Sequence, residues 1–218
     1  MAATAERKSG LSKVRAGRRL LALVALTLAV AAPASAATTD GLVGDCGYTY
    51  VQPFTPWLDL ANYALVPDGG LESGADGWRL DGGAAVANEN ESFSVRDSGD
   101  SKSLSLPAGS SATTSSVCIA ATSPDLRFFA RKDGSMLSTL KVEVLYTGLF
   151  GQPRALTVAI LTGGQSWQPT VPIAFLTNLT LLPLLTDGTT SVAFRFTPLG
   201  SSTEWRVDDV YVDPFKGE

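Results

Sequence analysis

Two adjacent carboxylates, Asp208 and Asp209, interrupt an otherwise apolar, strand-like stretch near the end of the chain. Side chains alternate between the faces of a strand, so Trp205 and Val207 share one face while Val210 falls on the other. A β-bulge at the acid pair would return both groups to the core side. It would also leave backbone carbonyls and one carboxylate pointing the same way, a setting that suits Ca²⁺. The alternative is an acid pair that is solvated or bonded to turn amides.

Most other catalytic chemistry is missing, because the sequence contains no histidine. This absence excludes Ser-His and Cys-His nucleophiles and the usual zinc and non-haem iron sites. Neither a Gly-x-Ser-x-Gly elbow nor a phosphate-binding Gly-x-x-x-x-Gly-Lys loop occurs. Paired carboxylates could still work as in glycosidases, but the spacing singles out no pair. We therefore expect no catalytic residues, no organic cofactor and no enzymatic activity.

Aromatic residues crowd the segment between Cys46 and Tyr63. Its prolines, Pro53 and Pro56, disfavour a helix or a central strand, so residues 37–64 are expected to form an irregular arm. Exposed rings could serve there as a ligand platform, since aromatic faces stack on sugars. Rings in a short, pinned arm usually pack inward, which favours a hydrophobic plug instead. The candidate platform residues are Tyr48, Tyr50, Trp57 and Tyr63.

The N-terminus has the pattern of a secretory signal peptide over residues 1–36. Basic residues precede an apolar run from Leu20 to Ala32 that is too short to span a bilayer, and Ala34-Ser35-Ala36 is typical of a cleavage site. An uncleaved anchor is the alternative. The pair Arg18-Arg19 leaves both the general secretory and the twin-arginine route open. We expect a secreted, extracellular protein.

Cleavage would make the chain strongly acidic. Residues 1–36 hold six of the 17 basic residues and one of the 21 acidic residues. No cluster of Lys and Arg remains after their removal. Nucleic acids and anionic membranes bind concentrated cationic surfaces, so neither is expected as a partner.

The chain has two cysteines, Cys46 and Cys118. In an exported protein such a pair is most simply a disulfide. Two free thiols are one alternative. A lipid anchor at Cys46 is the other, and Asp45 argues against it because a lipobox needs a small residue there.

Residues 65–218 contain many short alternating segments separated by Gly, Pro and Asp turn signals. Such a pattern predicts an antiparallel sandwich or barrel rather than βαβ units. One short helix or loop is expected between Leu176 and Leu185, where leucines recur every third position. The best-defined strand candidates are Leu126 to Arg131 (with Phe128 and Phe129 on opposite faces), Leu140 to Tyr146, Leu156 to Ile160, and Val192 to Phe196.

Two stretches resemble the opening and closing signatures of galactose-binding-like jelly rolls, in particular of calcium-containing carbohydrate-binding modules. The opening is Asp68-Gly69-Gly70-Leu71-Glu72 followed by Gly77-Trp78, and the closing is Trp205-Arg206-Val207-Asp208-Asp209-Val210. The modules have Asn and Phe where this chain has Asp68 and Leu71. The resemblance covers residues 65–212 and implies an all-β fold, a jelly-roll β-sandwich in which the two stretches meet. Residues 37–218 also resemble an uncharacterised group of exported proteins from high-GC Gram-positive bacteria.

The resemblance also implies roles for single residues. Glu72 and Asp209, with Asp208 as the alternative, would hold a structural calcium that ties the first strand to the last. Trp78 and Trp205 fall at core positions of such modules, which leaves the aromatic arm as the remaining sugar platform.

Three functions stay open at this point. The first is an exported, non-catalytic module that binds a glycan or a cell-wall component. The second is a structural or protein-interaction role at the cell surface, without a sugar site. The third is a carboxylate-dependent hydrolase, which would need a pocket with two facing acids.

Overall fold

The computed structural model describes residues 46–120, 124–148, 150–175 and 189–213. The expected signal peptide and the expected short helix or loop between Leu176 and Leu185 lie outside these ranges. Within them, antiparallel strands form two sheets, accompanied by one short 3₁₀ helix, η1 (Thr55–Trp57). No helix in the described ranges is long and apolar enough to cross a membrane.

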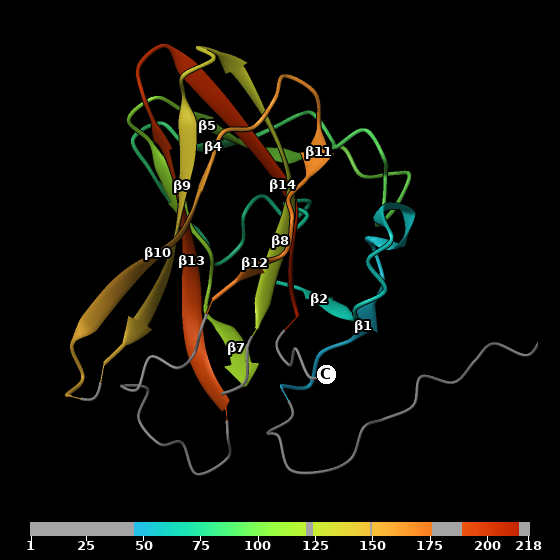
Figure 1. Ribbon diagram of the computed structural model, residues 1–218, viewed down its shortest axis with the longest axis vertical. Coiled ribbons are helices and arrows are strands. Elements are labelled where there is room, and N and C mark those ends of the chain that lie inside the picture. The colour runs from blue at the N-terminus through green and yellow to red at the C-terminus, as the bar shows by residue number, and fades with distance from the viewer. Residues whose placement is uncertain (1–45, 121–123, 149, 176–188, 214–218) are drawn as a thin grey trace, which may run out of the picture. The chain divides into compact units, whose positions relative to one another are not determined.

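The first sheet is organised around its last strand, β14, which has neighbours along both edges (Figure 1). One edge pairs with β8, while the other pairs with β5 and then with β2. The sheet consists of β1 (Tyr50–Val51), β2 (Tyr63–Leu65), β4 (Ala85–Ala87), β5 (Ser103–Pro107), β8 (Asp125–Gly134), β11 (Gln168–Pro169), β12 (Ile173–Ala174) and β14 (Thr203–Asp213).

The second sheet runs in the order β10-β9-β13-β6-β3, and β7 pairs with the beginning of β13. A long hairpin made by β9 and β10 forms one end of this order. The sheet consists of β3 (Arg79–Asp81), β6 (Ser111–Thr113), β7 (Val117–Ala120), β9 (Thr139–Thr147), β10 (Pro153–Leu161) and β13 (Thr189–Leu199).

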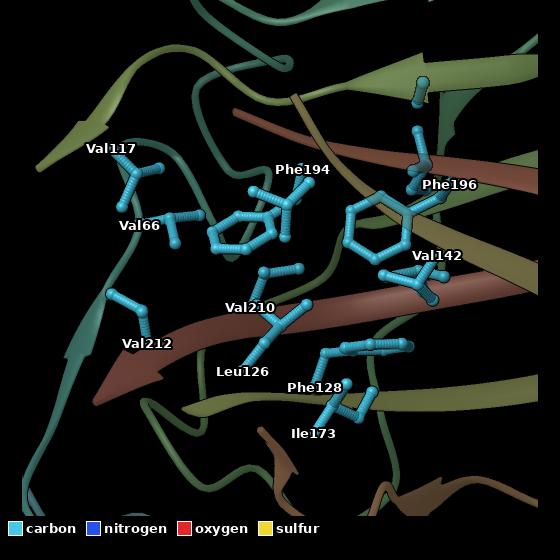
Figure 2. Close-up of a cluster of buried hydrophobic side chains, with 14 of the residues drawn as sticks. Val66, Val117, Leu126, Phe128, Val142, Ile173, Phe194, Phe196, Val210 and Val212 are labelled. Atoms are coloured by element: carbon cyan, nitrogen blue, oxygen red, sulfur yellow. The ribbon is translucent and has the colours of Figure 1, made fainter. Parts of the chain in front are cut away.

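The core lies between the two sheets and confirms the predicted sandwich. Figure 2 shows side chains of both sheets meeting there, with Phe194 and Phe196 of β13 above Leu126 and Phe128 of β8. Each predicted strand is present, and alternation places the apolar side chains of β9 and β13 inward. The expected alternation in β10 is wrong, because a register shift between Thr157 and Ala159 interrupts the strand and leaves Leu156 and Ile160 exposed. Phe128 belongs to this main core, whereas Phe129 points to the opposite face and joins a second aromatic cluster. The expected division of these two rings is therefore confirmed.

The predicted bulge in β14 is also confirmed. Asp208 lies opposite Phe129 and Tyr211 lies opposite Arg127, so Asp209 and Val210 together face the single residue Phe128. Asp209 has a φ of 47°, a left-handed conformation that aspartate tolerates better than most residues. The extra residue restores the phase, because the four apolar side chains expected to point inward are all buried, namely Trp205, Val207, Val210 and Val212.

The opening and closing stretches meet at this bulge. Val66 N–H donates to the carbonyl of Val210, and Val210 N–H donates to the carbonyl of Gly69, each over 3.0 Å. A Cβ on Gly69 would lie 2.6 Å from the carbonyl oxygen of Val210, so only glycine allows this approach. Pairing also extends into the segment expected to be irregular, because β2 joins β14 and β1 joins β2.

The expected disulfide links Cys46 to Cys118. It ties the start of the described chain to β7 in the second sheet. Close by, the Tyr48 hydroxyl accepts a hydrogen bond of 2.8 Å from Cys118 N–H. The arm is thus attached to both sheets, through the disulfide to one and through β1 and β2 to the other.

Candidate functional site

The carboxylate of Asp208 is fully buried and accepts hydrogen bonds from two backbone N–H groups. Its Oδ2 accepts a hydrogen bond of 2.8 Å from Glu91 N–H, and its Oδ1 accepts one of 2.8 Å from Asp209 N–H. Burial and the neighbouring charge of Asp209 raise the pKa of Asp208 to about 9. Asp208 therefore fastens the loop before β5 to the bulge.

Asp209 differs from its neighbour, since its side chain is 1% exposed and neither carboxylate oxygen has a hydrogen-bond partner among the described residues. The nearest cation is Arg96, whose Nε lies 3.6 Å from Oδ1 and whose Nη2 lies 2.6 Å from Asp100. Burial raises the pKa of Asp209 to about 7, Arg96 opposes the rise, and the acids Glu91, Asp100 and Glu72 add to it. Asp209 is therefore a buried carboxylate that accepts no hydrogen bond from the described residues and lies among other acidic residues.

Glu72, the other expected calcium ligand, lies near Asp209 and is partly satisfied by the backbone. Its Oε1 accepts hydrogen bonds from Ser101 N–H and Lys102 N–H at 2.7 and 2.8 Å. Burial is the main cause of the raised pKa of Asp209, and the charge of Glu72 adds to it. That Glu72 and Asp209 share a calcium ion stays a prediction of the resemblance.

The arrangement fits a cation at Asp209, because a buried carboxylate without hydrogen bonds needs positive charge. Ca²⁺ takes six to eight oxygen ligands, and the carboxylate of Asp209 supplies two that are open. Among the residues with described positions, no three Asp, Glu or Cys side chains converge on one point. If a calcium ion binds here, Asp209 and Glu72 would hold it. Without an ion, Arg96 is the nearest positive charge to the carboxylate of Asp209.

The aromatic arm packs inward. Tyr63 is 1% exposed, and its hydroxyl donates to Asp59 over 2.8 Å, so it presents no face to a ligand. Trp57 lies edge-on against Phe93 and Phe129, with ring centroids 4.9 and 5.4 Å apart. These rings cover the outer face of the first sheet, where Phe129 needs apolar neighbours.

The four candidate platform residues therefore form no common surface. Tyr63 belongs to the aromatic cluster on the first sheet, and Trp57 packs against that cluster. Tyr48 and Tyr50 instead pack against the main core between the sheets. The segment therefore packs as a hydrophobic plug and does not form an aromatic ligand platform.

An open hollow lies on the second sheet, beside the β9–β10 hairpin. Its volume is about 520 Å³. Ala155, Leu145 and Ala193 lie side by side across β10, β9 and β13 and contribute small and apolar side chains. The remaining lining residues are mostly polar, and none is acidic, comprising Ser116, Tyr146, Thr147, Pro153, Arg154, Ser191, Val192 and Arg195.

A row of polar side chains crosses the same sheet next to the hollow. Cross-strand register aligns Thr157, Glu143, Arg195 and Thr113, and Arg79 follows on β3. Glu143 Oε2 lies 2.9 Å from Arg195 Nε and 3.1 Å from Lys141 Nζ. The hydrogen bond from Arg195 holds the pKa of Glu143 below its usual range, although burial opposes this. Glu143 therefore fixes two cations at the edge of the hollow.

Sequence reasoning identified part of these sites. Strand alternation places Lys141, Glu143 and Arg195 on the outer face of β9 and β13, but nothing in the spacing shows that a hollow lies beside them. Arg96 and Glu91 come from an irregular loop without periodicity, so only the folded chain brings them to the acid pair.

No family model matches the chain, and no curated protein matches it. Solved structures with a similar course of the chain include a family 61 carbohydrate-binding module in complex with beta-1,4-galactotriose. It is 15% identical with a TM-score of 0.41, over 69% of this chain and 97% of the module. A family 16 carbohydrate-binding module is 17% identical with a TM-score of 0.47, over 68% of this chain and 98% of its own length.

The enzymatically active domain of bacteriophage CBA120 tailspike protein 4 is also similar. It is 15% identical with a TM-score of 0.47, over 67% of this chain and 21% of its own length. At these identities and TM-scores, no ligand or activity of this chain follows from the neighbours.

Proposed function

We propose that this protein is an exported, non-catalytic β-sandwich module that binds a glycan in the hollow on its second sheet. The observation that carries the proposal is the composition of this hollow. Hydroxyl groups and Arg195 surround a floor of small and apolar side chains, and the hollow is open to solvent. A sugar chain needs such an open surface with hydrogen-bonding groups placed around an apolar floor.

The lining supports binding rather than hydrolysis. Glycoside hydrolysis needs two facing carboxylates about 5 to 10 Å apart. No acidic residue is found among the described side chains that line the hollow. The adjacent pair Asp208 and Asp209 is buried in the bulge of β14, within the first sheet, and so lies away from it.

Retention on insoluble polysaccharides and on purified cell walls tests this proposal. The test variant is Ala193→Trp, which fills the floor of the hollow from the outer face of β13. The matched control is Val171→Trp, because Val171 is exposed on the loop between β11 and β12. We expect the wild type and the control to be retained and Ala193→Trp to pass through, with all three melting cooperatively. A wild type that passes through on every polysaccharide would contradict a glycan-binding role.

Export is part of the proposal and has its own test. A disulfide between Cys46 and Cys118 suits an oxidising compartment. When the full gene is expressed in a Gram-positive host, the protein in the medium should begin at Ala37. Retention of the whole product in the cell pellet would argue for an anchored form.

A protein-interaction role is the second candidate, and one surface feature favours it. Met136 and Leu137, 73% and 92% exposed, stand at the turn between β8 and β9. The buried ammonium of Lys132 donates to the carbonyls of Met136 and Ser138 at 2.8 and 2.9 Å, so the turn is held firmly. A pre-ordered apolar tip loses little entropy when a partner covers it. If Met136→Ser/Leu137→Ser removes attachment to cells while Ala193→Trp retains it, this role is the correct one.

A further inference from the structure

The β9–β10 hairpin leaves one edge of the second sheet without a neighbouring strand. Figure 1 shows β10 as the outermost strand of this sheet, and within the described part of the chain β9 is the one strand that pairs with it. The first half of β10, residues 153–157, is exposed throughout. Such an edge presents unpaired N–H and C=O groups, which pair readily with a further strand.

The hydrogen bond that closes the hairpin determines which backbone groups of β10 face outward. Gly148 N–H donates to the carbonyl of Gln152 over 2.8 Å, so these two residues form a hydrogen-bonded pair. Hydrogen-bonded and non-hydrogen-bonded pairs alternate along an antiparallel ladder. The backbone polar groups of Pro153, Ala155 and Thr157 therefore point away from β9. Proline fits position 153, because the N–H that it lacks would have no partner in β9.

This edge has few of the features that usually prevent strands from pairing. The segment from Ala155 to Leu161 contains no charged residue, no proline and no glycine. Exposed strands of such composition pair with other strands unless something covers them. Pro153 limits a new ladder at its beginning, and the bulge after Thr157 limits it at its end. Residues 153–157 therefore form the stretch that is open to pairing.

The stretch is complementary to a second copy of itself. About a two-fold axis at Ala155, each alanine donates to and accepts from the other, and Thr157 N–H donates to the carbonyl of Pro153 of the second copy. Arg154, the one charged residue of β10, falls opposite Leu156 rather than opposite itself, so like charges do not meet directly. β10 also has no acidic residue, so the charge that repels two copies of an acidic chain is absent from this contact.

Leu156 gives the pairing an apolar contact. Register places Leu156 and Arg154 on the same face of β10, and Leu156 is 36% exposed in the single chain. Across the two-fold axis, the aliphatic part of each Arg154 would cover Leu156 of the other copy. Arginine suits this position because it buries its methylene groups along apolar surface and keeps its guanidinium in water.

We propose that two copies of the chain pair through residues 153–157 of β10 and join their second sheets into one continuous antiparallel sheet. The two-fold axis stands perpendicular to this sheet, so the outer faces of both copies lie on the same side. Ala155 lies on that face beside Leu145 and Ala193, so the floors of the two hollows meet at the axis. The pairing itself does not depend on a ligand. Its consequence for binding, that one sugar chain spans both hollows, rests on the proposed function.

Sedimentation equilibrium of the chain from Ala37 to Glu218, without glycan, tests the pairing. We expect a reversible dimer whose fraction rises with protein concentration. Ala155→Pro removes the outward N–H at the axis and leaves the hydrogen bonds to β9 in place, so it should be monomeric where the wild type is dimeric. Ala155→Ser is the matched control. It keeps both the N–H and a small side chain, and it should form dimers as the wild type does.

A charge exchange tests the register. Leu156→Lys places an ammonium opposite Arg154 of the second copy and should weaken the dimer about tenfold, since like charges directly opposite each other destabilise a ladder. Arg154→Glu/Leu156→Lys makes the same pair attractive and should bring the dimer back to within about threefold of the wild type. Both side chains are exposed, so each variant should melt as cooperatively as the wild type.

The outcomes separate this proposal from glycan binding. A wild type that stays monomeric up to about 1 mM would overturn the pairing, and a dimer that survives in Ala155→Pro would place the contact on another surface and overturn it as well. If Ala155→Pro does not fold, the charge exchange decides, and failure of the double variant to recover the dimer would overturn the register. Retention on polysaccharides is measured separately. A monomer that is retained would overturn the dimer alone, and a dimer that no polysaccharide retains would remove the glycan proposal alone.

Discussion

The carboxylate of Asp209 and the guanidinium of Arg96 face each other across the junction that closes the sandwich, with Oδ1 and Nε 3.6 Å apart. Both oxygens of Asp209 are buried and receive no hydrogen bond from the described residues. A buried carboxylate in this state costs free energy unless positive charge compensates it. Arg96 divides its charge between Asp209 and Asp100, so the compensation is incomplete.

Calcium is therefore expected to stabilise the fold, with Asp209 and Glu72 as side-chain ligands. Excess Ca²⁺ should raise the melting temperature relative to chelator. At a free concentration a hundredfold above its Kd, the gain would be about 3 kcal/mol. Differential scanning calorimetry of the wild type and of Asp209→Asn measures this, and the variant should lose the response. Identical melting in Ca²⁺ and in chelator would leave Arg96 as the counter-charge of Asp209.

Stability in chelator should fall as pH rises from about 5 to about 9. Burial raises the pKa of Asp208 to about 9 and that of Asp209 to about 7, while an unfolded aspartate titrates near 4. Between these values the folded state binds more protons than the unfolded state, so raising the pH favours unfolding. One pKa unit corresponds to about 1.4 kcal/mol, so the loss should reach a few kcal/mol.

Few other groups contribute to this pH dependence, although burial also raises the pKa of Asp100 and adds to the loss at the lower end of the range. The sequence has no histidine. Hydrogen bonds from Arg131 and Arg195 lower the pKa values of Glu89 and Glu143, and the stability they contribute is lost only as pH falls below about 4. Urea unfolding of the wild type and of Asp208→Asn across the window gives the measurement. If the free energy of unfolding falls equally steeply with pH in the wild type and in the variant, the pH dependence belongs to another group.

The sandwich could be predicted from the sequence because the patterns that indicate it lie within single strands and turns. Alternation over a few residues places Phe194 and Phe196 inward, and the phase break at Asp208 and Asp209 requires a bulge wherever the strand lies. Each of these features can be read within one strand or turn.

The hollow and the ion contact of Asp209 could not be predicted this way. Arg195 meets Glu143 through strand register, and Arg96 reaches Asp209 from an irregular loop. Such contacts depend on which strands are neighbours and how loops cross them, and neither follows from local periodicity. The aromatic arm shows the same limit, since composition alone allowed both a platform and a plug.

Loss of the disulfide should destabilise the protein substantially. Cys46 and Cys118 are 72 positions apart, and closing a loop of this length stabilises a fold by about 4 kcal/mol in the chain-entropy treatment. Cys46→Ser/Cys118→Ser should lower the urea midpoint, and reductant should affect the wild type but not the variant. Equal stability of the oxidised wild type and the variant would show that the arm is held mainly by its packed rings.

The arm should also depend on the ion pair between Asp59 and Arg127, because Arg127 is almost fully buried. Its guanidinium stacks 4.0 Å from the ring centre of Phe54 and donates to the carbonyl of Thr170. Asp59→Ala would leave this buried charge unpaired and remove the acceptor of the Tyr63 hydroxyl, which should cost about 3 kcal/mol. Asp59→Asn keeps an oxygen acceptor and should cost less. Urea unfolding followed by tryptophan fluorescence compares the two, and equal small losses would mean that aromatic packing alone holds the arm to the sheet.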